Sequence, residues 1–367
     1  MNGNDFLALA NAGVQQLQPY QPGKPIDELE RELGISHIIK LASNESPVGS
    51  SPMAMAAVRA ALDQLHRYPD GSGHGLKSAL AQRLGLSVAQ VTLGNGSNDI
   101  LELVARAYLS AGDEAIYSEH GFAIYPIITL ASGGVPVKVP ARNYGHDLQA
   151  MAAAVTERTR VIFVANPNNP TGTWFPRAEL DAFLAAVPER VLVVLDEAYF
   201  EYVEDPNFAN GADYLAQHAN LLVARTFSKI YGLSGLRVGY GLSGTAVADV
   251  LNRVRQPFNV NSLGLVAAEA ALDDLEFLEH ARDINTAGLV QVAEGLQQLG
   301  LEYIPSVCNF IAFNCGREAM PVYQALLREG VIVRPIAGYD LPNHLRVTIG
   351  TPEENERFLE SLQRVLG

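Results

Sequence analysis

The chain has 367 residues, which is more than one hydrophobic core usually supports, so we expect two domains that share a cleft. Apolar residues make up 48% and charged residues 18% of the chain, a balance that excludes a disordered or fibrous protein. The formal net charge of -14 argues against nucleic acid and anionic membranes as partners, because both would repel the surface at long range.

The cysteine and histidine content predicts neither disulfides nor a metal site. Cys308 and Cys315 are too few for a secreted disulfide framework, so a reducing cytoplasm fits best. The eight histidines include no HxxxH or HExxH pair, so we expect no bound metal. Residues 1–13 lack a signal-peptide pattern, and the longest apolar runs, such as VLVVL at 191–195, are too short to span a bilayer.

The predicted elements begin with a helix at Ser51 and Pro52, an N-cap residue followed by a proline at the first helical position. From about residue 90 to 260, short β-rich runs alternate with helical patterns, among them ILELVARAYL after Asn98. This alternation predicts βα units and a mostly parallel sheet. Several predicted strands are apolar throughout, as strands covered on both faces must be. The seven predicted strands are 91–93, 114–118, 135–139, 160–165, 191–195, 221–226 and 236–242.

Beyond about residue 260, long helical stretches lead to short strands near 309–313, 331–334 and 345–348. Thr351, with Pro352 and Glu354, forms a capping-box start for a last amphipathic helix. The expected fold class is therefore α/β, with a large domain built on a mostly parallel seven-stranded sheet flanked by helices, and a smaller α+β domain. The predicted limits are 1–47 for an N-terminal arm and part of the small domain, 48–258 for the large domain and 259–367 for the small C-terminal domain.

Four polar motifs each follow a predicted strand: GNGSND at 94–99, NPNNPTG at 166–172, LDEAYFEY at 195–202 and TFSKIYGLSGLRVGYG at 226–241. In an open α/β sheet the carboxyl ends of the strands face one crevice. Asn169, Asp196 and Lys229 are 27 and 33 residues apart, about one βαβ unit each, so we expect them to converge. A lone lysine in a turn is usually solvated, but the joint pattern is far more specific.

A lysine, an aspartate and an asparagine beside a phosphate site match the groups of pyridoxal 5′-phosphate. Lys229 would form the Schiff base with the cofactor aldehyde, because only an amine does so. Asp196 would pair with the pyridinium nitrogen and keep it protonated. Tyr199 and Asn169 would bind the phenolic oxygen, and Arg237 would hold the phosphate bidentately.

The segment GNGSND nearly matches the dinucleotide fingerprint G-x-G-x-x-G, but Asp99 stands at the third glycine, so a dehydrogenase is a weak rival. We interpret the segment as a phosphate cup at a helix start. Phe122 follows another strand and would stack on the pyridine ring, although an aromatic there is as often a core residue. The predicted cup consists of Gly96, Ser97, Asn98, Thr226, Ser228 and Arg237.

With these motifs the chain resembles the fold-type I aminotransferases and looks most like the histidinol-phosphate aminotransferase family, over essentially its whole length. The segments PYQPGKPIDELERELG at 19–34, LASNESP at 41–47 and RYPDGSG at 67–73 are similar to that family's signatures. Related enzymes commonly have LASNENP, so Ser46 is a small departure that leaves Asn44 and Glu45 in place.

The resemblance implies roles for residues that the spacing alone does not assign. Tyr68 would reach across a homodimer interface to the cofactor phosphate of the neighbouring subunit, which makes the active site composite. Tyr20, Asn44 and Asn309 would lie on the substrate side of the cleft. Each has an ordinary turn or strand residue as its alternative interpretation.

Arg334 and Arg346 lie on two predicted strands of the small domain and suggest an anion clamp. By the resemblance they would hold the substrate phosphate in one half-reaction and the glutamate carboxylate in the other. The expected reaction is a ping-pong transamination through Lys229 that converts histidinol phosphate and 2-oxoglutarate to imidazole acetol phosphate and glutamate, in histidine biosynthesis. Three alternatives stay open: an aromatic-amino-acid aminotransferase, a decarboxylase of a phosphorylated amino acid that uses the same cofactor, and a cofactor-binding regulator without catalysis.

Overall fold

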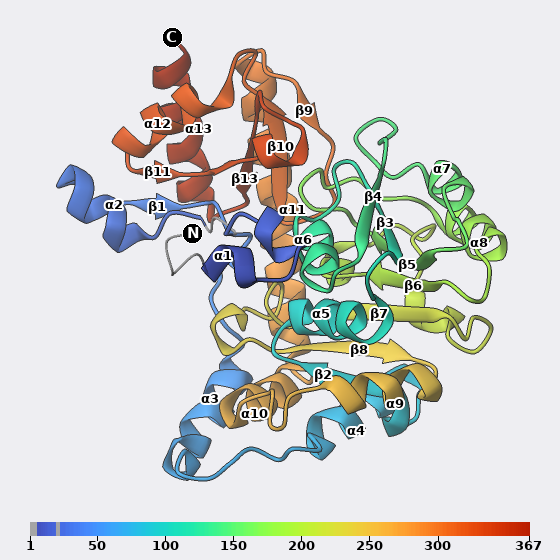
Figure 1. The fold of residues 1–367 in the computed structure, drawn as a ribbon. Coiled ribbons are helices and arrows are strands. Elements are labelled where there is room, and N and C mark those ends of the chain that lie inside the picture. Colours follow the sequence, from blue (N-terminus) through green and yellow to red (C-terminus); the bar gives the residue numbers. More distant parts are fainter. Residues whose placement is uncertain (1–5, 20–22) are drawn as a thin grey trace.

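The structure is a computed structural model that describes residues 6–19 and 23–367. A large sheet with helices on both faces forms one domain, a smaller domain lies beside it, and the long helix α11 runs from one to the other (Figure 1). The large sheet has the strand order β2-β8-β7-β6-β5-β3-β4. Its strands are β2 Val91–Gly94, β3 Glu114–Ser118, β4 Val135–Val139, β5 Thr159–Ala165, β6 Leu192–Asp196, β7 Leu221–Thr226 and β8 Gly239–Ser243.

The predicted seven-stranded sheet is confirmed, and it has one antiparallel member. β8 runs antiparallel to both β2 and β7, whereas the other neighbouring pairs are parallel. β8 also begins later than the strand predicted at 236–242, because Ser234–Leu236 is a short 3-10 helix and Arg237 has a left-handed backbone with φ 54°. Arg237 therefore precedes β8. Since β8 is antiparallel, its beginning lies at the same edge as the carboxyl ends of the parallel strands.

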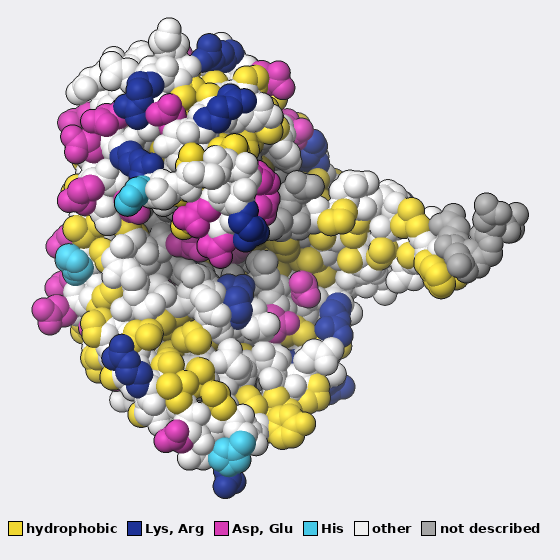
Figure 2. Space-filling view, turned by 90° about the vertical axis from the view of Figure 1, so that its left-hand side faces the viewer, with side chains coloured by type: hydrophobic (Ala, Val, Ile, Leu, Met, Phe, Trp, Pro, Cys, Tyr) yellow, Lys and Arg dark blue, Asp and Glu magenta, His cyan; other side chains and the backbone are white. Residues whose placement is uncertain are grey.

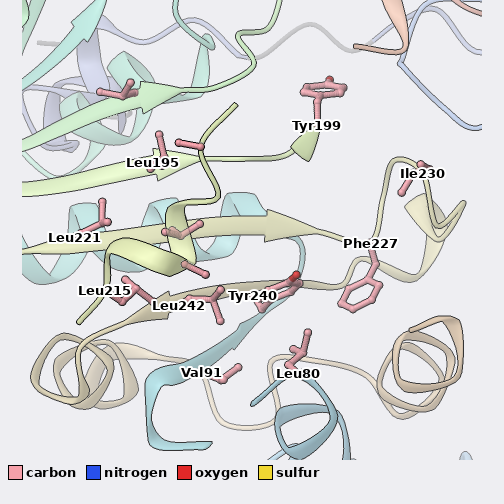
Figure 3. Packing of buried hydrophobic residues seen from close by; sticks show 14 of the residues in the cluster. Leu80, Val91, Leu195, Tyr199, Leu215, Leu221, Phe227, Ile230, Tyr240 and Leu242 are labelled. Atoms are coloured by element: carbon pink, nitrogen blue, oxygen red, sulfur yellow. The ribbon is translucent and has the colours of Figure 1, made fainter. Parts of the chain in front are cut away.

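The helices of the large domain cover both faces of this sheet because its central strands are apolar on both sides. On β5, Ile162 and Val164 belong to one core cluster, whereas Val161 and Phe163 belong to the cluster on the opposite face. Figure 3 shows the first cluster, with side chains from neighbouring strands pointing to one side of the sheet. The helices are α3 Pro52–Ala61, α4 His74–Leu84, α5 Ser97–Tyr108, α6 Ile124–Ala131, α7 Leu148–Ala153, α8 Arg177–Ala186, α9 Thr245–Val254 and α10 Ser262–Ala271.

Two helix starts bear on the predictions. The Ser51 hydroxyl accepts from the Ala54 amide at 3.1 Å, with Pro52 at the first helical position, so the predicted cap of α3 is confirmed. α5 begins at Ser97, with Gly96 as its N-cap, which is earlier than a helix that follows Asn98. The amides of Ser97 and Asn98 therefore lie in the first turn of a helix, where they have no intrahelical partners.

The small domain has a four-stranded sheet in the order β12-β13-β10-β9 and a separate pair, β1 with β11. The parallel β1–β11 pair joins residues 39–40 to residues 331–332, so the segment before the large domain contributes to the small one, as expected. The predicted capping box is present at Thr351, and α13 follows it. The remaining α-helices and strands of the chain are α1 Phe6–Leu9, α2 Ile26–Leu33, β1 Ile39–Lys40, α11 Leu275–Gln298, β9 Tyr303–Ile304, β10 Phe310–Asn314, α12 Ala319–Arg328, β11 Val331–Ile332, β12 Arg334–Pro335, β13 His344–Thr348 and α13 Pro352–Leu366.

The helix α10 lies with the large domain, although the predicted boundary at residue 258 assigned it to the small one. It packs against α3 and α4, as Figure 1 shows. Its buried Ala267 and Ala268 share a core cluster with Leu76 and Leu80 of α4. The packing therefore favours a boundary within α11.

Within residues 6–19 and 23–367, no helix is long and apolar enough to cross a membrane. In the same ranges no group of three or more His, Cys, Asp or Glu side chains could hold a metal ion.

Candidate active site

A cavity of about 280 Å³ opens where the carboxyl ends of the large sheet meet the small domain. Strand ends, the start of α5 and the small-domain strands β12 and β13 all contribute to its walls. The convergence expected from the strand-end motifs is therefore observed. The predicted residues that line the cavity are Asn44, Ser97, Asn98, Phe122, Asn169, Asp196, Tyr199, Thr226, Ser228, Lys229, Arg237, Arg334 and Arg346.

Lys229 lies in the loop after β7, and its amine points into the cavity. Its neighbours Phe227 and Ile230 are fully buried in the core cluster, which fixes the loop (Figure 3). The Nζ atom donates weakly to the carbonyls of Ser43 and Asn44, at 3.4 and 3.3 Å. Burial lowers the pKa of Lys229 to about 8, and the positive charge of Arg346 adds to the effect. A substantial fraction of the amine is therefore neutral and nucleophilic near neutral pH.

Asp196 ends β6 and is buried, with 5% of its surface exposed. Its Oδ2 accepts a hydrogen bond from the Tyr125 hydroxyl at 2.9 Å, whereas no partner for Oδ1 exists in the part of the chain that the structure describes. Burial raises the pKa of Asp196 from 3.8 to about 6, and the Tyr125 hydrogen bond opposes that rise. The carboxyl group is thus poised for a cationic partner that would restore its ionised form.

Tyr199 is held by Asn44, which connects it to the small domain. The Asn44 side-chain amide donates to the Tyr199 hydroxyl at 2.7 Å, and the Asn44 backbone amide donates to Thr348 Oγ1 at 2.9 Å. Burial raises the pKa of Tyr199 above its usual range. Asn309, predicted on the substrate side, is fully buried and does not line the cavity; its side chain donates to the Asn44 carbonyl at 3.1 Å. Asn309 therefore supports Asn44 from behind.

The residues predicted to form a phosphate cup lie together as a group of neighbouring donors, and their role stays a prediction. Arg237 Nη1 donates to Ser228 Oγ and to the Ser234 carbonyl, each at 3.1 Å. Gly96 lies against the same guanidinium, since a Cβ placed on it would be 2.4 Å from Arg237 Nη2. Its φ of 85° and ψ of 164° are also open essentially to glycine alone. Gly96 thus allows Arg237 to reach the first turn of α5.

The two predicted clamp arginines are in register on neighbouring strands, Arg334 on β12 opposite Arg346 on β13. Arg346 donates to the Asn169 side-chain oxygen and, at 2.9 Å, to the Ala42 carbonyl. Its guanidinium carbon lies 5.1 Å from the centroid of the Phe310 ring. Asn169, which we expected near the phenolic oxygen of a cofactor, therefore also joins the large domain to the small one.

Two further aromatic residues that the sequence motifs did not indicate line the cavity, Tyr125 on α6 and Tyr339 after β12. Phe122, predicted to stack on a ring, packs edge-on against Tyr125, with ring centroids 5.9 Å apart. Its stacking role stays a prediction.

Tyr68 lies away from this chain's own cavity. It is 83% exposed and stacks on Phe258, with 4.9 Å between ring centroids. Tyr20 lies outside the described residues.

Comparison with known proteins agrees with this geometry. The family described as aminotransferase class I and II matches residues 36–362. The chain belongs to the class I and II aminotransferases. It is 64% identical over 364 residues to histidinol-phosphate aminotransferase 2 of Pseudomonas fluorescens, covering 99% of this chain and 98% of that protein. The protein of the same name from Pseudomonas aeruginosa is 64% identical over 99% of both chains.

Among solved structures, histidinol-phosphate aminotransferase from Sinorhizobium meliloti in complex with pyridoxal-5′-phosphate has a TM-score of 0.90 and 31% identity, over 97% of this chain and 96% of that chain. The fold expected from the sequence is therefore confirmed, as is the resemblance to histidinol-phosphate aminotransferases. The rival interpretation of GNGSND as a dinucleotide-binding fingerprint is not consistent with membership of the aminotransferase family.

Proposed function

We propose that this aminotransferase uses pyridoxal 5′-phosphate to convert histidinol phosphate and 2-oxoglutarate to imidazole acetol phosphate and glutamate. The observation that carries the proposal is a buried lysine of lowered pKa in one cavity with a buried carboxylate and two clamp arginines. Relatives at 64% identity bear the name of this activity, and the Sinorhizobium meliloti protein of that name is in complex with the cofactor. The cytoplasm stays the predicted location.

The residues present fit the cofactor. The buried Asp196 oxygen without a partner among the described residues suits a protonated pyridine nitrogen. The contact of Gly96 with the Arg237 guanidinium places that cation beside the first turn of α5, and the guanidinium and the first-turn amides would bind a phosphate together. Phe122 would cover the ring, with Tyr199 and Asn169 at the phenolic oxygen, and Lys229 would supply the amine.

When bound, the cofactor supplies an aldehyde that combines with amines and a ring that accepts electrons from the substrate carbon. The chain's own residues do the rest. Lys229 Nζ is the base that takes a proton from the substrate carbon and returns it, since its lowered pKa keeps part of it neutral. The Asp196 carboxylate keeps the pyridine nitrogen protonated, and the Asn44 amide holds the Tyr199 hydroxyl in place.

Both proposed amino donors, histidinol phosphate and glutamate, carry an anionic group, and the two clamp arginines suit both. Arg334 and Arg346 face the same cavity from adjacent strands, so a phosphate or a carboxylate can accept hydrogen bonds from either guanidinium. This pair supports histidinol phosphate over phenylalanine, because an uncharged aromatic side chain makes no charge-assisted hydrogen bond with the clamp.

The test of the proposed function is a panel of amino donors with 2-oxoglutarate as the acceptor. We expect glutamate to form fastest with histidinol phosphate and at least tenfold more slowly with phenylalanine, because phenylalanine lacks a charge-assisted hydrogen bond to the clamp, which is worth about 1.5–3 kcal/mol. Preference for phenylalanine would favour the aromatic alternative, and release of carbon dioxide would favour decarboxylation. Formation of no product with any donor would favour a regulator.

We also propose that two copies of the chain form a homodimer with composite active sites. Tyr68 and Phe258 are exposed large side chains outside the cavity, and so are Met53, Leu62 and Leu65 on or after α3. Hydrophobic side chains gather on the lower part of the face in Figure 2, over the region of α3. A surface of this kind is typical of an interface.

The composite site is tested by mixing two variants. Lys229→Ala removes the amine, and Tyr68→Ala removes the side chain that would cross the interface. We expect hybrid dimers formed by unfolding and refolding the two together to regain activity that neither parent has, because one site then has both residues. A chain that sediments as a monomer, or hybrids without recovered activity, would contradict the dimer with composite sites.

A further inference from the structure

One hydrogen bond in the cavity wall involves a residue, Tyr125, that the sequence motifs did not indicate. The Tyr125 hydroxyl of α6 donates to Asp196 Oδ2 at the end of β6, over 2.9 Å. Tyr125 is fully buried and Asp196 is 5% exposed. The second carboxylate oxygen, Oδ1, is also buried and is without a hydrogen-bond partner in residues 6–19 and 23–367. The two oxygens of one carboxylate therefore have different surroundings.

We propose that Tyr125 is a positioning residue, which holds the Asp196 carboxylate through Oδ2 in the orientation in which it meets the pyridine nitrogen of the cofactor. The proposal rests on the proposed function in one respect, namely that the cavity binds pyridoxal 5′-phosphate. A carboxylate with one oxygen held by a hydrogen bond can rotate little about its Cβ–Cγ bond. The orientation of the carboxylate is then set before the cofactor arrives, and no binding energy is lost in establishing it.

The Tyr125 ring is itself fixed on two sides. It stacks on Phe163 of β5, with ring centroids 4.9 Å apart and an angle of 3° between the planes. Phe122 meets it edge-on at 5.9 Å and 90°. The backbone carbonyl of Tyr125 accepts from the Thr129 hydroxyl at 2.7 Å, within α6. The hydroxyl therefore has a defined direction, and the same ring supports the residue expected to stack on the cofactor.

The charges around this pair favour Tyr125 as the donor and Asp196 as the ionised acceptor. Burial raises the pKa of Tyr125 well above its usual value, and the carboxylate charge of Asp196 adds to the rise, so the phenol keeps its proton. For Asp196, burial and Glu197 disfavour the charged form, whereas the hydrogen bonds from Tyr125 and from the Ala198 amide, together with Lys229, favour it. The remaining titratable groups that act on Tyr125 are the phenols Tyr339 and Tyr199.

The test uses the full chain, freed of cofactor and titrated with pyridoxal 5′-phosphate. Tyr125→Phe removes one hydroxyl and keeps the stacked ring. We expect the dissociation constant of the cofactor to rise about tenfold, because a hydrogen bond to a charged group is lost. We also expect the pH midpoint of the bound cofactor's absorbance change to rise, since a less firmly held carboxylate leaves less positive charge on the pyridine ring.

Two controls separate positioning from general loss of packing. Tyr108 is half-buried at the far end of α5 in the same apolar cluster, so Tyr108→Phe should leave both readouts unchanged. In an Asp196→Asn background, adding Tyr125→Phe should change the dissociation constant less than about twofold, because the residue acts through the lost charge. That pair also has no unpaired charge, so it tests the coupling even where the single variant folds poorly.

An affinity and a pH midpoint within about twofold and a few tenths of a unit of wild type in Tyr125→Phe would overturn the proposal. So would an equal loss of affinity in the Asp196→Asn background, because Tyr125 would then act independently of the carboxylate. Since the probe is cofactor binding and not turnover, failure of the donor panel contradicts the proposed substrate without altering this result.

Discussion

Replacing Gly96 by alanine should weaken cofactor binding through Arg237. The new Cβ would lie 2.4 Å from Arg237 Nη2 and 3.1 Å from Cζ, so the guanidinium must leave its position beside the first turn of α5. Loss of a charge-assisted contact with the phosphate removes about 1.5–3 kcal/mol, which predicts a rise in the dissociation constant of roughly tenfold to a hundredfold. A second effect is backbone strain of about 1–3 kcal/mol, because φ of 85° with ψ of 164° is a region used by glycine.

Gly85→Ala separates these two effects. Gly85 ends α4 with a left-handed φ of 66°, but no atom of residues 6–19 and 23–367 lies within 4 Å of a Cβ placed on it. It should lower stability by about 1 kcal/mol and leave cofactor affinity unchanged. The assay is titration of cofactor-free protein with pyridoxal 5′-phosphate, followed by absorbance, with thermal unfolding measured in parallel. Wild-type affinity in Gly96→Ala would refute the role assigned to the Gly96–Arg237 contact.

Three further outcomes are expected. Arg346→Ala should raise KM for both glutamate and histidinol phosphate at least tenfold, because Arg346 lines the cavity. Arg317 is an exposed arginine of the same domain, so Arg317→Ala should change neither KM. Unchanged KM values for Arg346→Ala would contradict the clamp. Asp196→Asn should stabilise the cofactor-free protein at pH 8 by up to about 3 kcal/mol. Burial raises the pKa of Asp196 from 3.8 to about 6, so above that pH the buried negative charge destabilises the folded state. The gain should vanish as pH falls below about 4, and urea unfolding at both pH values checks it. The rate of covalent attachment of the cofactor to Lys229, followed by stopped-flow absorbance, should rise with pH to a midpoint near 8, since burial lowers the pKa of that amine to about 8; a midpoint near 10.5 would mean a solvated lysine.

The large sheet could be predicted because its strands are apolar runs bounded by turn residues, a signal that each strand carries by itself. The start of β8 could not. Leu236 and Val238 look like strand residues on either side of Arg237, yet Arg237 has a left-handed backbone before the strand begins. Its conformation is set by the cavity that the guanidinium enters, which is a tertiary requirement without a local pattern.

The packing partner of α10 could not be predicted for a related reason. An alanine-rich helix such as Ser262–Ala271 has a clear helical pattern, but the pattern does not say against which domain the helix packs. Small side chains allow the close contact with α3 that the structure contains.

Most of the candidate site could be predicted because Asn169, Asp196 and Lys229 follow strands of one sheet, where topology brings them together. Tyr125 could not be found in this way. It lies in the apolar helix IYPIITLA, whose pattern is typical of a core helix, and its hydrogen-bond partner Asp196 is 71 residues away. The Ser43 carbonyl near Lys229 was missed as well, because a backbone acceptor has no side-chain signature.

The proposed reaction depends most directly on a covalent bond between the cofactor and Lys229. Borohydride reduction of the purified protein, followed by proteolysis and mass spectrometry, would locate that bond. We expect one modified peptide, which contains Lys229, and its loss in Lys229→Ala. Modification of Lys77 or another lysine in place of Lys229, or a wild-type protein that takes up no cofactor, would contradict it.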